Sequence, residues 1–359
     1  MPTLGSPLPD GKGMTVKAVQ MVAPGRLELR DVGVPEVGPR GVLVKVAGAG
    51  VCHSDLHVLH MEQLPMTGFT MGHEGAGWVQ EVGAHVTGFE KDDPVLVTAG
   101  WSCGRCRACV EGRDNVCQVT GSRMQAPTIP GLGPDGAMAE YILVDAHHLV
   151  KLGSIDPATA SPLADAGLTP MGAINSARSR LTPDSTAVVI GLGGLGNVAL
   201  QILHATSGAR VIGIDREQSK LDLAEKSGVD ELVLAGPGAA QHILDETAGY
   251  GADAVFDFVG VQDTVDLATS IIAPGGALRF IGLGGGQFTF GADYSNRLPW
   301  QVNAQLVYGG TRTDQLEVLD LARRGKVTLD VQRYPLAEFE RAFADLELGR
   351  VSGRAVLIP

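Results

Sequence analysis

The stretch from residue 188 to residue 215 constrains the fold of this chain more than any other part of its sequence. It reads VVIGLGGLGNVALQILHATSGARVIGID, so a short apolar strand precedes a glycine turn, an apolar helix and a second strand. The turn places Gly191, Gly193 and Gly196 in G-x-G-x-x-G spacing. A strand, a glycine turn and a helix in this order predict one βα unit of a doubly wound parallel sheet.

The same turn has the chemistry of a dinucleotide site. In G-x-G-x-x-G turns the glycines allow a tight bend, close approach of a pyrophosphate and close packing of helix on strand. Gly194 and Leu195 complete the turn at the positive end of the helix. Asp215 follows about twenty residues later, where a carboxylate accepts bonds from the adenosine ribose and repels a 2′-phosphate. The pattern favours NAD, and Arg216 leaves NADP open as an alternative.

The rhythm of strands and helices divides the 359 residues into two domains. Short strands broken by Gly, Asp and Pro predict a barrel-like β domain early in the chain, and from about residue 169 strands and helices alternate. The last residues form a helix, a second helix and a strand, which we expect to return to the first domain. We predict a disordered tail at 1–13, a β domain at 14–166 with 311–359, and an α/β domain at 167–310.

Composition excludes several classes of function. Forty acidic against 28 basic residues give a net charge of −12, which disfavours a nucleic-acid partner. No apolar run has membrane-spanning length, and the first residues, MPTLGSPLPDGKG, lack the apolar core of a signal peptide. We therefore expect a cytoplasmic protein without nucleic-acid or membrane partners.

Four of the five cysteines, Cys103, Cys106, Cys109 and Cys117, are clustered. An odd total with four clustered argues against a secreted disulfide framework and for a metal. Four thiolates complete the tetrahedral shell of zinc and leave no position for a substrate, so a structural zinc is predicted. An iron–sulfur cluster and reduced free thiols are the alternatives, although ferredoxin spacing differs.

The fifth cysteine stands apart, in VCHSDLH, and a histidine follows in GHEG. Cys52 and His73 could provide two ligands of an open zinc site. Sequence spacing alone leaves packed core residues as an equal alternative.

The chain resembles zinc-dependent medium-chain alcohol dehydrogenases of the bacterial secondary-alcohol type. The matching segments are VCHSDLH, MGHEGAGWVQEVG, the four cysteines, SPLADAGLTP, and GLGGLG with its later aspartate. They occur in the family's order and cover nearly everything after Met14. The resemblance implies a GroES-like β catalytic domain built from both chain ends around a Rossmann domain. It also implies reversible hydride transfer between an alcohol and NAD, giving a ketone or aldehyde.

The resemblance implies two zinc ions per subunit and assigns the catalytic one to Cys52, His73 and Asp165. Asp165 stands where many members have a cysteine, and its alternative is an exposed acid at a helix end. Asp55 would hold the ring of His73 in place. Glu74 would be an alternate or outer ligand.

The resemblance also assigns a proton path. Ser54 would pass the proton of the alcohol through the nicotinamide ribose to His57, whose alternative is a solvent-facing histidine. His53 replaces an arginine that the family often places on the pyrophosphate, and we expect it to hold the cofactor less firmly.

The remaining cofactor contacts come from the resemblance alone. Lys220 would lie near the adenosine ribose, Thr169 near the nicotinamide, Val259 and Leu283 beside the ring, and Arg354 on the pyrophosphate. Each could instead be an ordinary surface or core residue.

The sequence predicts little about the substrate pocket. Ala99 stands where the family often has an aromatic wall, which favours bulky secondary alcohols or ketones. Trp101 or the stretch 61–71 could refill that space.

Two other functions stay open at this stage. A zinc-free quinone reductase of the same superfamily would generally lack the clustered cysteines. Intact Cys52, Ser54 and His73 argue against a non-catalytic dinucleotide-binding protein. We expect a homo-oligomer, by analogy a homotetramer, with strands near 300–308 pairing across a two-fold axis.

Overall fold

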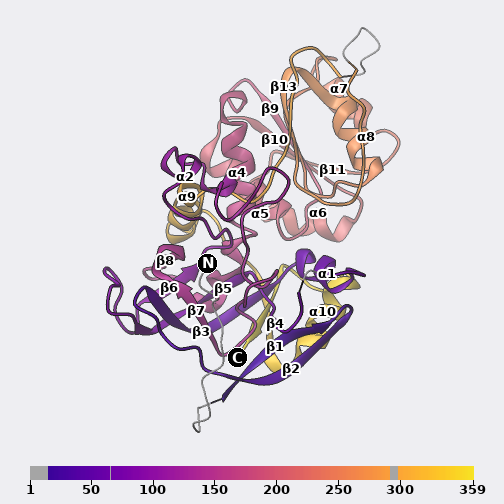
Figure 1. Ribbon diagram of the computed structural model, residues 1–359. Helices are drawn as coiled ribbons and strands as arrows, with labels where there is room; N and C mark the ends of the chain where they lie inside the picture. The colour runs from indigo at the N-terminus through magenta and orange to yellow at the C-terminus, as the bar shows by residue number, and fades with distance from the viewer. Residues whose placement is uncertain (1–14, 65, 292–297) are drawn as a thin grey trace. The chain divides into compact units, whose positions relative to one another are not determined.

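The computed structural model describes residues 15–64, 66–291 and 298–359, so the predicted tail at 1–13 lies outside the described residues. Contacts divide the chain into two units (Figure 1). Unit 1 takes residues up to 165, 311–323 and 329–359, and unit 2 takes 166–310 and 324–328. Segment 324–328, which we had placed in the β domain, contacts unit 2. The reason is a side-chain clamp, because the amide of Gln201 donates to the carbonyl of Thr328 at 3.1 Å and accepts from its N–H at 2.8 Å.

Unit 2 is built on a six-stranded parallel sheet in the order β11-β10-β9-β12-β13-β14. Its strands are β9 (Thr186–Ile190), β10 (Arg210–Asp215), β11 (Glu231–Leu234), β12 (Ala252–Asp257), β13 (Ile272–Phe280) and β14 (Asn303–Leu306). Its helices are α4 (Leu168–Ser176), α5 (Gly196–Thr206), α6 (Gln218–Ala224), α7 (Ala239–Glu246) and α8 (Gln262–Ile271). The order reverses between β9 and β12, which lie side by side, so this is a Rossmann sheet with its switch point there.

The central strands of this sheet are apolar on both faces, as expected where helices cover a parallel sheet. Val188, Ile212, Val255 and Leu278 are fully buried. The apolar runs 254–259 and 278–283 predict two strands here, but β12 ends at Asp257 and β13 at Phe280. The glycines that follow turn the chain, and Gly260 has a φ of +71° that favours glycine.

Unit 1 is a β domain made from both ends of the chain. Its larger sheet has the order β15-β16-β3-β5-β6-β8, with β7 also paired to β3, and a smaller sheet has the order β2-β1-β4. The C-terminal strand pairs antiparallel with β3, so the last segment of the chain returns to the β domain as predicted. The strands are β1 (Thr15–Ala23), β2 (Arg26–Gly33), β3 (Gly41–Val51), β4 (Phe69–Thr70), β5 (Glu74–Val82), β6 (Pro94–Val97), β7 (Tyr141–Asp145), β8 (Leu149–Lys151), β15 (Val331–Pro335) and β16 (Arg354–Ile358).

Short helices surround these sheets. They are α1 (His53–Leu59), α2 (Arg107–Val110), α3 (Pro157–Ala160), α9 (Arg312–Arg323) and α10 (Phe339–Glu347), with single-turn 3₁₀ segments that include η1 (Asp114–Val116) and η3 (Ser161–Ala164). Among the described residues, no helix has the length and apolar character needed to cross a membrane.

A buried arginine ties the edge strand of unit 2 to the rest of its sheet. Arg279 on β13 is 3% exposed, and burial lowers its pKa. Its guanidinium donates to the carbonyl of Asn303 on β14 and to the hydroxyl and carbonyl of Ser176, each at 2.7 Å. Ser176 ends α4, so the cation lies at the negative end of a helix.

Replacing this arginine should destabilise unit 2. Arg279→Met removes the donor that the part-buried bonds to Ser176 and Asn303 share, and we expect the free energy of unfolding to fall by about 1–2 kcal/mol. The exposed Arg180 in the same unit is the control, since Arg180→Met should change stability by less than about 0.5 kcal/mol. Denaturant unfolding of both variants measures the difference, and equal stability would contradict the bridging role of Arg279.

Candidate metal and dinucleotide sites

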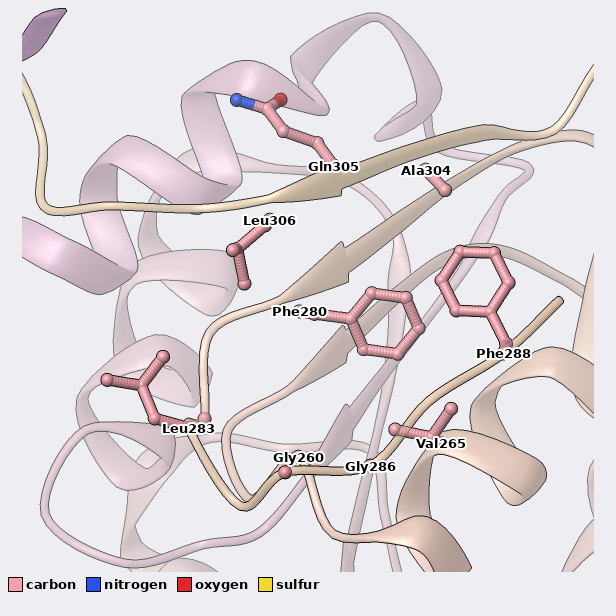
Figure 2. A pocket seen from close by; sticks show the side chains of 11 residues that line it. Gly260, Val265, Phe280, Leu283, Gly286, Phe288, Ala304, Gln305 and Leu306 are labelled. Atoms are coloured by element: carbon pink, nitrogen blue, oxygen red, sulfur yellow. The ribbon is translucent and has the colours of Figure 1, made fainter. Parts of the chain in front are cut away.

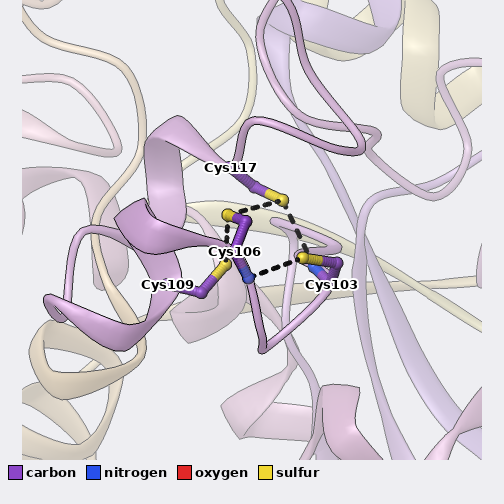
Figure 3. A group of neighbouring side chains, drawn as sticks. All are labelled: Cys103, Cys106, Cys109 and Cys117. Atoms are coloured by element: carbon purple, nitrogen blue, oxygen red, sulfur yellow. Dashed lines mark hydrogen bonds between the residues drawn. The ribbon is translucent and has the colours of Figure 1, made fainter.

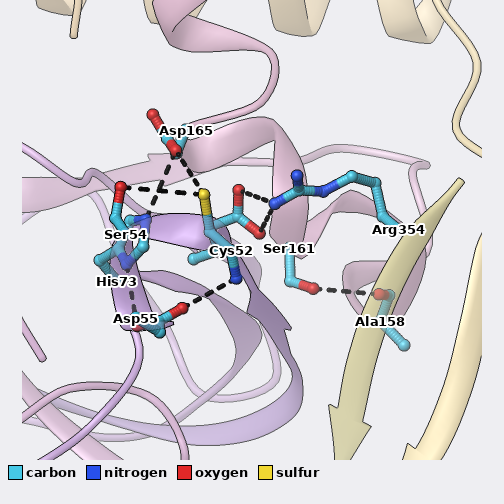
Figure 4. A network of polar contacts seen from close by, with 9 residues as sticks. Cys52, Ser54, Asp55, His73, Ala158, Ser161, Asp165 and Arg354 are labelled. Carbon is cyan, nitrogen blue, oxygen red and sulfur yellow. Dashed lines mark hydrogen bonds and ion pairs between the residues drawn. The ribbon is translucent and has the colours of Figure 1, made fainter. Parts of the chain in front are cut away.

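Four potential metal ligands meet inside unit 1. The ligand atoms of Cys52, His73, Glu74 and Asp165 all lie within 4.8 Å of one another. Cys52 is the N-cap of α1, His73 precedes β5, and Asp165 follows η3 (Figure 4). Residues that are 113 positions apart in the sequence thus converge on one buried point.

The spacing of three of these ligands matches a tetrahedral zinc. Asp165 Oδ2 lies 3.5 Å from Cys52 Sγ and 3.4 Å from His73 Nε2. Zinc bonds of about 2.3 Å to sulfur and about 2.1 Å to nitrogen or oxygen place tetrahedral ligands about 3.4 to 3.6 Å apart. The donor set therefore fits a zinc ion, and three protein ligands leave the fourth position of a tetrahedron open.

Asp55 links this site to helix α1. It is fully buried, and one carboxylate oxygen accepts from the N–H of Cys52 at 2.8 Å, which closes a capping box. The other oxygen lies 3.2 Å from Nδ1 of His73, as expected for a carboxylate that orients a metal-binding imidazole. Asp55 thus contacts both Cys52 and His73 and helps to fix their positions.

The electrostatics of the site favour a positive charge. Burial lowers the pKa of His73, but the charge of Asp55 and hydrogen bonds with Asp165, Asp55 and Cys52 raise it well above its ordinary value. Acidic groups around a ligand atom stabilise either a proton or a metal ion on it. The surroundings of His73 are therefore suited to a cation.

Glu74 is turned toward an arginine. Nη2 of Arg354 donates to both of its carboxylate oxygens, at 2.6 and 2.7 Å, and both side chains are buried. Burial and the charge of Asp165 raise the pKa of Glu74, whereas Arg354 and His73 lower it. Gly50 makes room for this pair, because a Cβ there would lie 1.9 Å from Oε2 of Glu74. Arg354, predicted on the pyrophosphate, is thus engaged by Glu74.

The proposed proton-path residues lie on α1. The hydroxyl of Ser54 lies 3.9 Å from Sγ of Cys52, beside the metal ligands. His53 and His57 are exposed and lie one helical turn apart, on the same side of the helix. The structure therefore places Ser54 at the ligands and His57 at the surface.

The four clustered cysteines form a second metal-binding group, which we call the cysteine lobe (residues 103–117; Figure 3). The sulfur of Cys106 lies 3.4 Å from that of Cys109 and 3.9 Å from that of Cys117, close to the roughly 3.8 Å expected in a zinc tetrathiolate. Burial raises the pKa of Cys117, but hydrogen bonds that include the N–H groups of Cys103 and Val119 lower it to about 5. Such N–H···S bonds stabilise thiolates, the form that binds metal.

The glycine turn of unit 2 has the form predicted from the sequence. A Cβ on Gly191 would lie 2.4 Å from Val259, and one on Gly196 would lie 1.8 Å from the carbonyl of Gly191. Gly193 is different, since a Cβ there would meet no atom within 4 Å. Packing thus explains the first and third glycines, whereas the second leaves an open approach for a ligand.

The other predicted cofactor residues of unit 2 have the following positions. Asp215 ends β10, and its carboxylate accepts from the N–H groups of Leu192 at 2.7 Å and Glu217 at 3.0 Å. The exposed Arg216 follows it, Lys220 is half-buried on α6, and Thr169 is buried on α4. Gly194 and Leu195 lead into α5. Val259 and Leu283 lie in turns after β12 and β13.

Two segments of the chain match models of known protein families. Residues 38–154 match the model described as "Alcohol dehydrogenase GroES-like domain", and residues 194–324 match "Zinc-binding dehydrogenase". An NAD-dependent alcohol dehydrogenase of Sulfolobus acidocaldarius is 36% identical over 342 residues, covering 92% of this chain and 96% of that protein. The chain belongs to the zinc-dependent medium-chain alcohol dehydrogenase family.

Solved structures agree with this family. The alcohol dehydrogenase of Aeropyrum pernix has a TM-score of 0.86 at 34% identity, covering 96% of this chain and 100% of that one. The acetophenone reductase of Geotrichum candidum, solved with NAD, has a TM-score of 0.83 at 31% identity, covering 97% and 99%. The predicted GroES-like and Rossmann domains are confirmed by these matches.

Unit 2 of this alcohol dehydrogenase contains an apolar cavity that our reading of the sequence missed. Its volume is about 480 Å³, and it lies between the glycine-rich turn 282–286 and β14 (Figure 2). Phe280 and Phe288 stack in its wall with ring centroids 5.3 Å apart. Leu283, predicted beside the nicotinamide ring, lines this cavity, and the glycines around it in the run GLGGG at 282–286 were the signal for it.

The three glycines of the nucleotide turn provide a matched test. Gly193→Ala should raise the dissociation constant of NADH roughly tenfold, because the added methyl occupies only ligand space, and should leave the melting temperature unchanged. Gly196→Ala should instead cost about 1–3 kcal/mol of stability through its clash with Gly191. Isothermal titration and thermal unfolding separate the two effects. Unchanged NADH affinity in Gly193→Ala would contradict a pyrophosphate site here.

Proposed function

We propose that this chain oxidises secondary alcohols to ketones reversibly, with NAD as the hydride acceptor and a catalytic zinc in unit 1. The observation that carries the proposal is the tetrahedral spacing of Cys52, His73 and Asp165. The G-x-G-x-x-G turn with Asp215 in the same chain supports the choice of NAD.

The first role of the site residues is to hold the metal. Cys52, His73 and Asp165 would be its protein ligands, with one thiolate and one carboxylate against the two charges of zinc. A bound zinc would supply Lewis acidity to the alcohol. Asp55 would orient His73. The ion pair with Arg354 would keep Glu74 beside the three ligands, and Glu74 would not itself bind the metal.

Ser54 and His57 would move the proton. The hydroxyl of Ser54 lies beside Cys52 and can accept a proton from the alcohol while donating its own. His57, which is exposed on the same helix, would take the proton to the surface. An exposed imidazole can pass the proton on to water.

NAD supplies the hydride acceptor. Asp215 would accept bonds from the adenosine ribose, assisted by Lys220, and the turn at 193–196 would receive the pyrophosphate. Thr169, Val259 and Leu283 would surround the nicotinamide. His53 would contact the pyrophosphate weakly.

Arg354 could reach the pyrophosphate only through donors that Glu74 does not use. Glu74 occupies Nη2, while Nε is buried and has no hydrogen-bond acceptor among the described residues. Five guanidinium N–H groups allow both contacts in principle.

The choice of a bulky secondary alcohol rests on Ala99. This residue is buried, and a small side chain leaves more space than an aromatic wall would. Trp101, the alternative wall, is buried and stacks on His148 with ring centroids 5.4 Å apart. Acetophenone reductase, a structural neighbour, is named for a bulky ketone.

A variant of the least expected ligand tests the proposed zinc site. We expect two zinc ions per chain in the native protein and one in Asp165→Ala, with NAD-linked oxidation of 1-phenylethanol lost, because two protein ligands hold zinc poorly. His57→Asn is the control and should keep both ions with reduced turnover. Elemental analysis and NADH absorbance give the readouts. Two ions and full activity in Asp165→Ala would contradict the assignment.

We also propose a homotetramer in the cytoplasm, where clustered thiols stay reduced. All four residues of β14 are exposed, and beyond β13 this strand has no further partner among the described residues. Leu306, Trp300 and Tyr308 expose 68%, 71% and 44% of their surface. An exposed edge strand flanked by exposed aromatic side chains favours pairing with a second copy.

Charge on this edge should weaken the assembly. Leu306→Lys places a cation on β14, and we expect the molecular mass in solution to fall, because pairing would bury that charge. Light scattering after size-exclusion chromatography measures the mass. An exposed leucine elsewhere provides the control, since Leu348→Lys should leave the mass unchanged. An unchanged mass in Leu306→Lys would contradict pairing through β14.

A further inference from the structure

We infer that Asp257 is a positioning residue for the nicotinamide half of the cofactor site. The inference rests on the proposed function, because it needs a dinucleotide bound to unit 2. Asp257 was absent from our sequence predictions. It is fully buried at the end of β12, in unit 2, and it is not one of the proposed zinc ligands.

The strand order gives Asp257 its place in the site. β12 lies next to β9 on one side and β13 on the other, while β10 lies on the far side of β9. A dinucleotide crosses such a switch point with one nucleotide on each side. Because Asp215 on β10 marks the adenosine side, the nicotinamide belongs at the turns that follow β12 and β13.

Asp257 holds both of these turns through hydrogen bonds. Its Oδ1 accepts from the N–H groups of Val259 and Gly260, each at 2.9 Å. Its backbone carbonyl accepts from the N–H groups of Ile281 at 2.8 Å and Gly282 at 3.1 Å. One residue thus fixes the end of each neighbouring strand.

The two turns contact each other backbone to backbone. A Cβ on Gly260 would lie 2.1 Å from the carbonyl oxygen of Gly282, and one on Gly282 would lie 2.4 Å from that of Val259. With no side chains between the turns at these points, their separation depends on backbone contacts and on the bonds to Asp257.

Val259 connects this arrangement to the pyrophosphate turn. Its Cγ2 lies so close to Gly191 that a Cβ there would be only 2.4 Å away. The turn at 259–260 is therefore held by a carboxyl group that need not touch the ring.

The carboxyl itself can be replaced conservatively. Burial raises the pKa of Asp257, while hydrogen bonds that include the N–H groups of Gly260 and Val259 lower it. Oδ2 is buried and has no hydrogen-bond partner among the described residues. An asparagine keeps the acceptor at the Oδ1 position, whereas alanine removes it.

Two ligands separate a positioning role from general stability. NADH contains the nicotinamide half, and ADP-ribose lacks the nicotinamide ring but keeps the adenosine and pyrophosphate. We expect Asp257→Ala to raise the dissociation constant of NADH about tenfold and that of ADP-ribose less than about twofold, and Asp257→Asn to stay within about twofold for both. Isothermal titration on the full-length, zinc-loaded protein provides all the values.

Asp253 provides the matched control. It lies on the same strand and accepts one backbone N–H, from Thr186 at 2.9 Å, but at the opposite end of the sheet. Asp253→Ala should leave both dissociation constants within about twofold of the native values. Equal weakening of NADH and ADP-ribose in Asp257→Ala, or no weakening of either, would overturn the positioning role while leaving NAD binding intact. Failure of the native protein to bind either ligand would overturn both proposals.

Discussion

The convergence of three side chains on one buried point is the constraint on which the account of this protein depends. Cys52, His73 and Asp165 come from a helix N-cap, a strand start and the end of a 3₁₀ turn. Uncompensated burial of such polar groups is costly, and a bound divalent cation compensates for it. The separations of 3.4 and 3.5 Å therefore have a physical explanation in a metal ion.

In each unit, one buried aspartate does two tasks. Asp55 caps helix α1 and orients His73, so the helix and the ligand share one hydrogen-bond acceptor. Asp257 acts in a similar way in unit 2, where it bonds two turns. In both places a buried carboxyl fixes local geometry through hydrogen bonds, and at Asp257 the neighbouring glycines leave little side-chain volume for packing. Sub-ångström placement of reacting groups needs this kind of support.

Much of the fold could be predicted from the sequence, because its signals are local. The glycine turn, the apolar strands and the clustered cysteines each lie within a few residues, and the described elements match them. Strand ends were less predictable: β12 and β13 end where backbone bonds to Asp257 and close glycine contacts turn the chain. Those contacts join residues that lie far apart in the sequence.

The site shows the same limit. The partners of Arg354 and Asp257 could not be predicted, since Glu74 lies 280 residues from Arg354 and the carboxyl of Asp257 looks like any strand-end acid. Local pattern placed Ser54 and Asp55 near Cys52, but only the folded chain brings Asp165 there. Resemblance to a family suggested Asp165 as a ligand. The distances from its carboxylate to Cys52 and His73 are consistent with that assignment.

Anomalous scattering at the zinc absorption edge, from crystals of the active protein grown with NADH, tests the central claim most directly. The account predicts a strong peak within about 2.0 to 2.4 Å of Cys52 Sγ, His73 Nε2 and a carboxylate oxygen of Asp165. A fully active crystal with no peak touching Cys52 and His73 would contradict it, although the dinucleotide fold of unit 2 would stand.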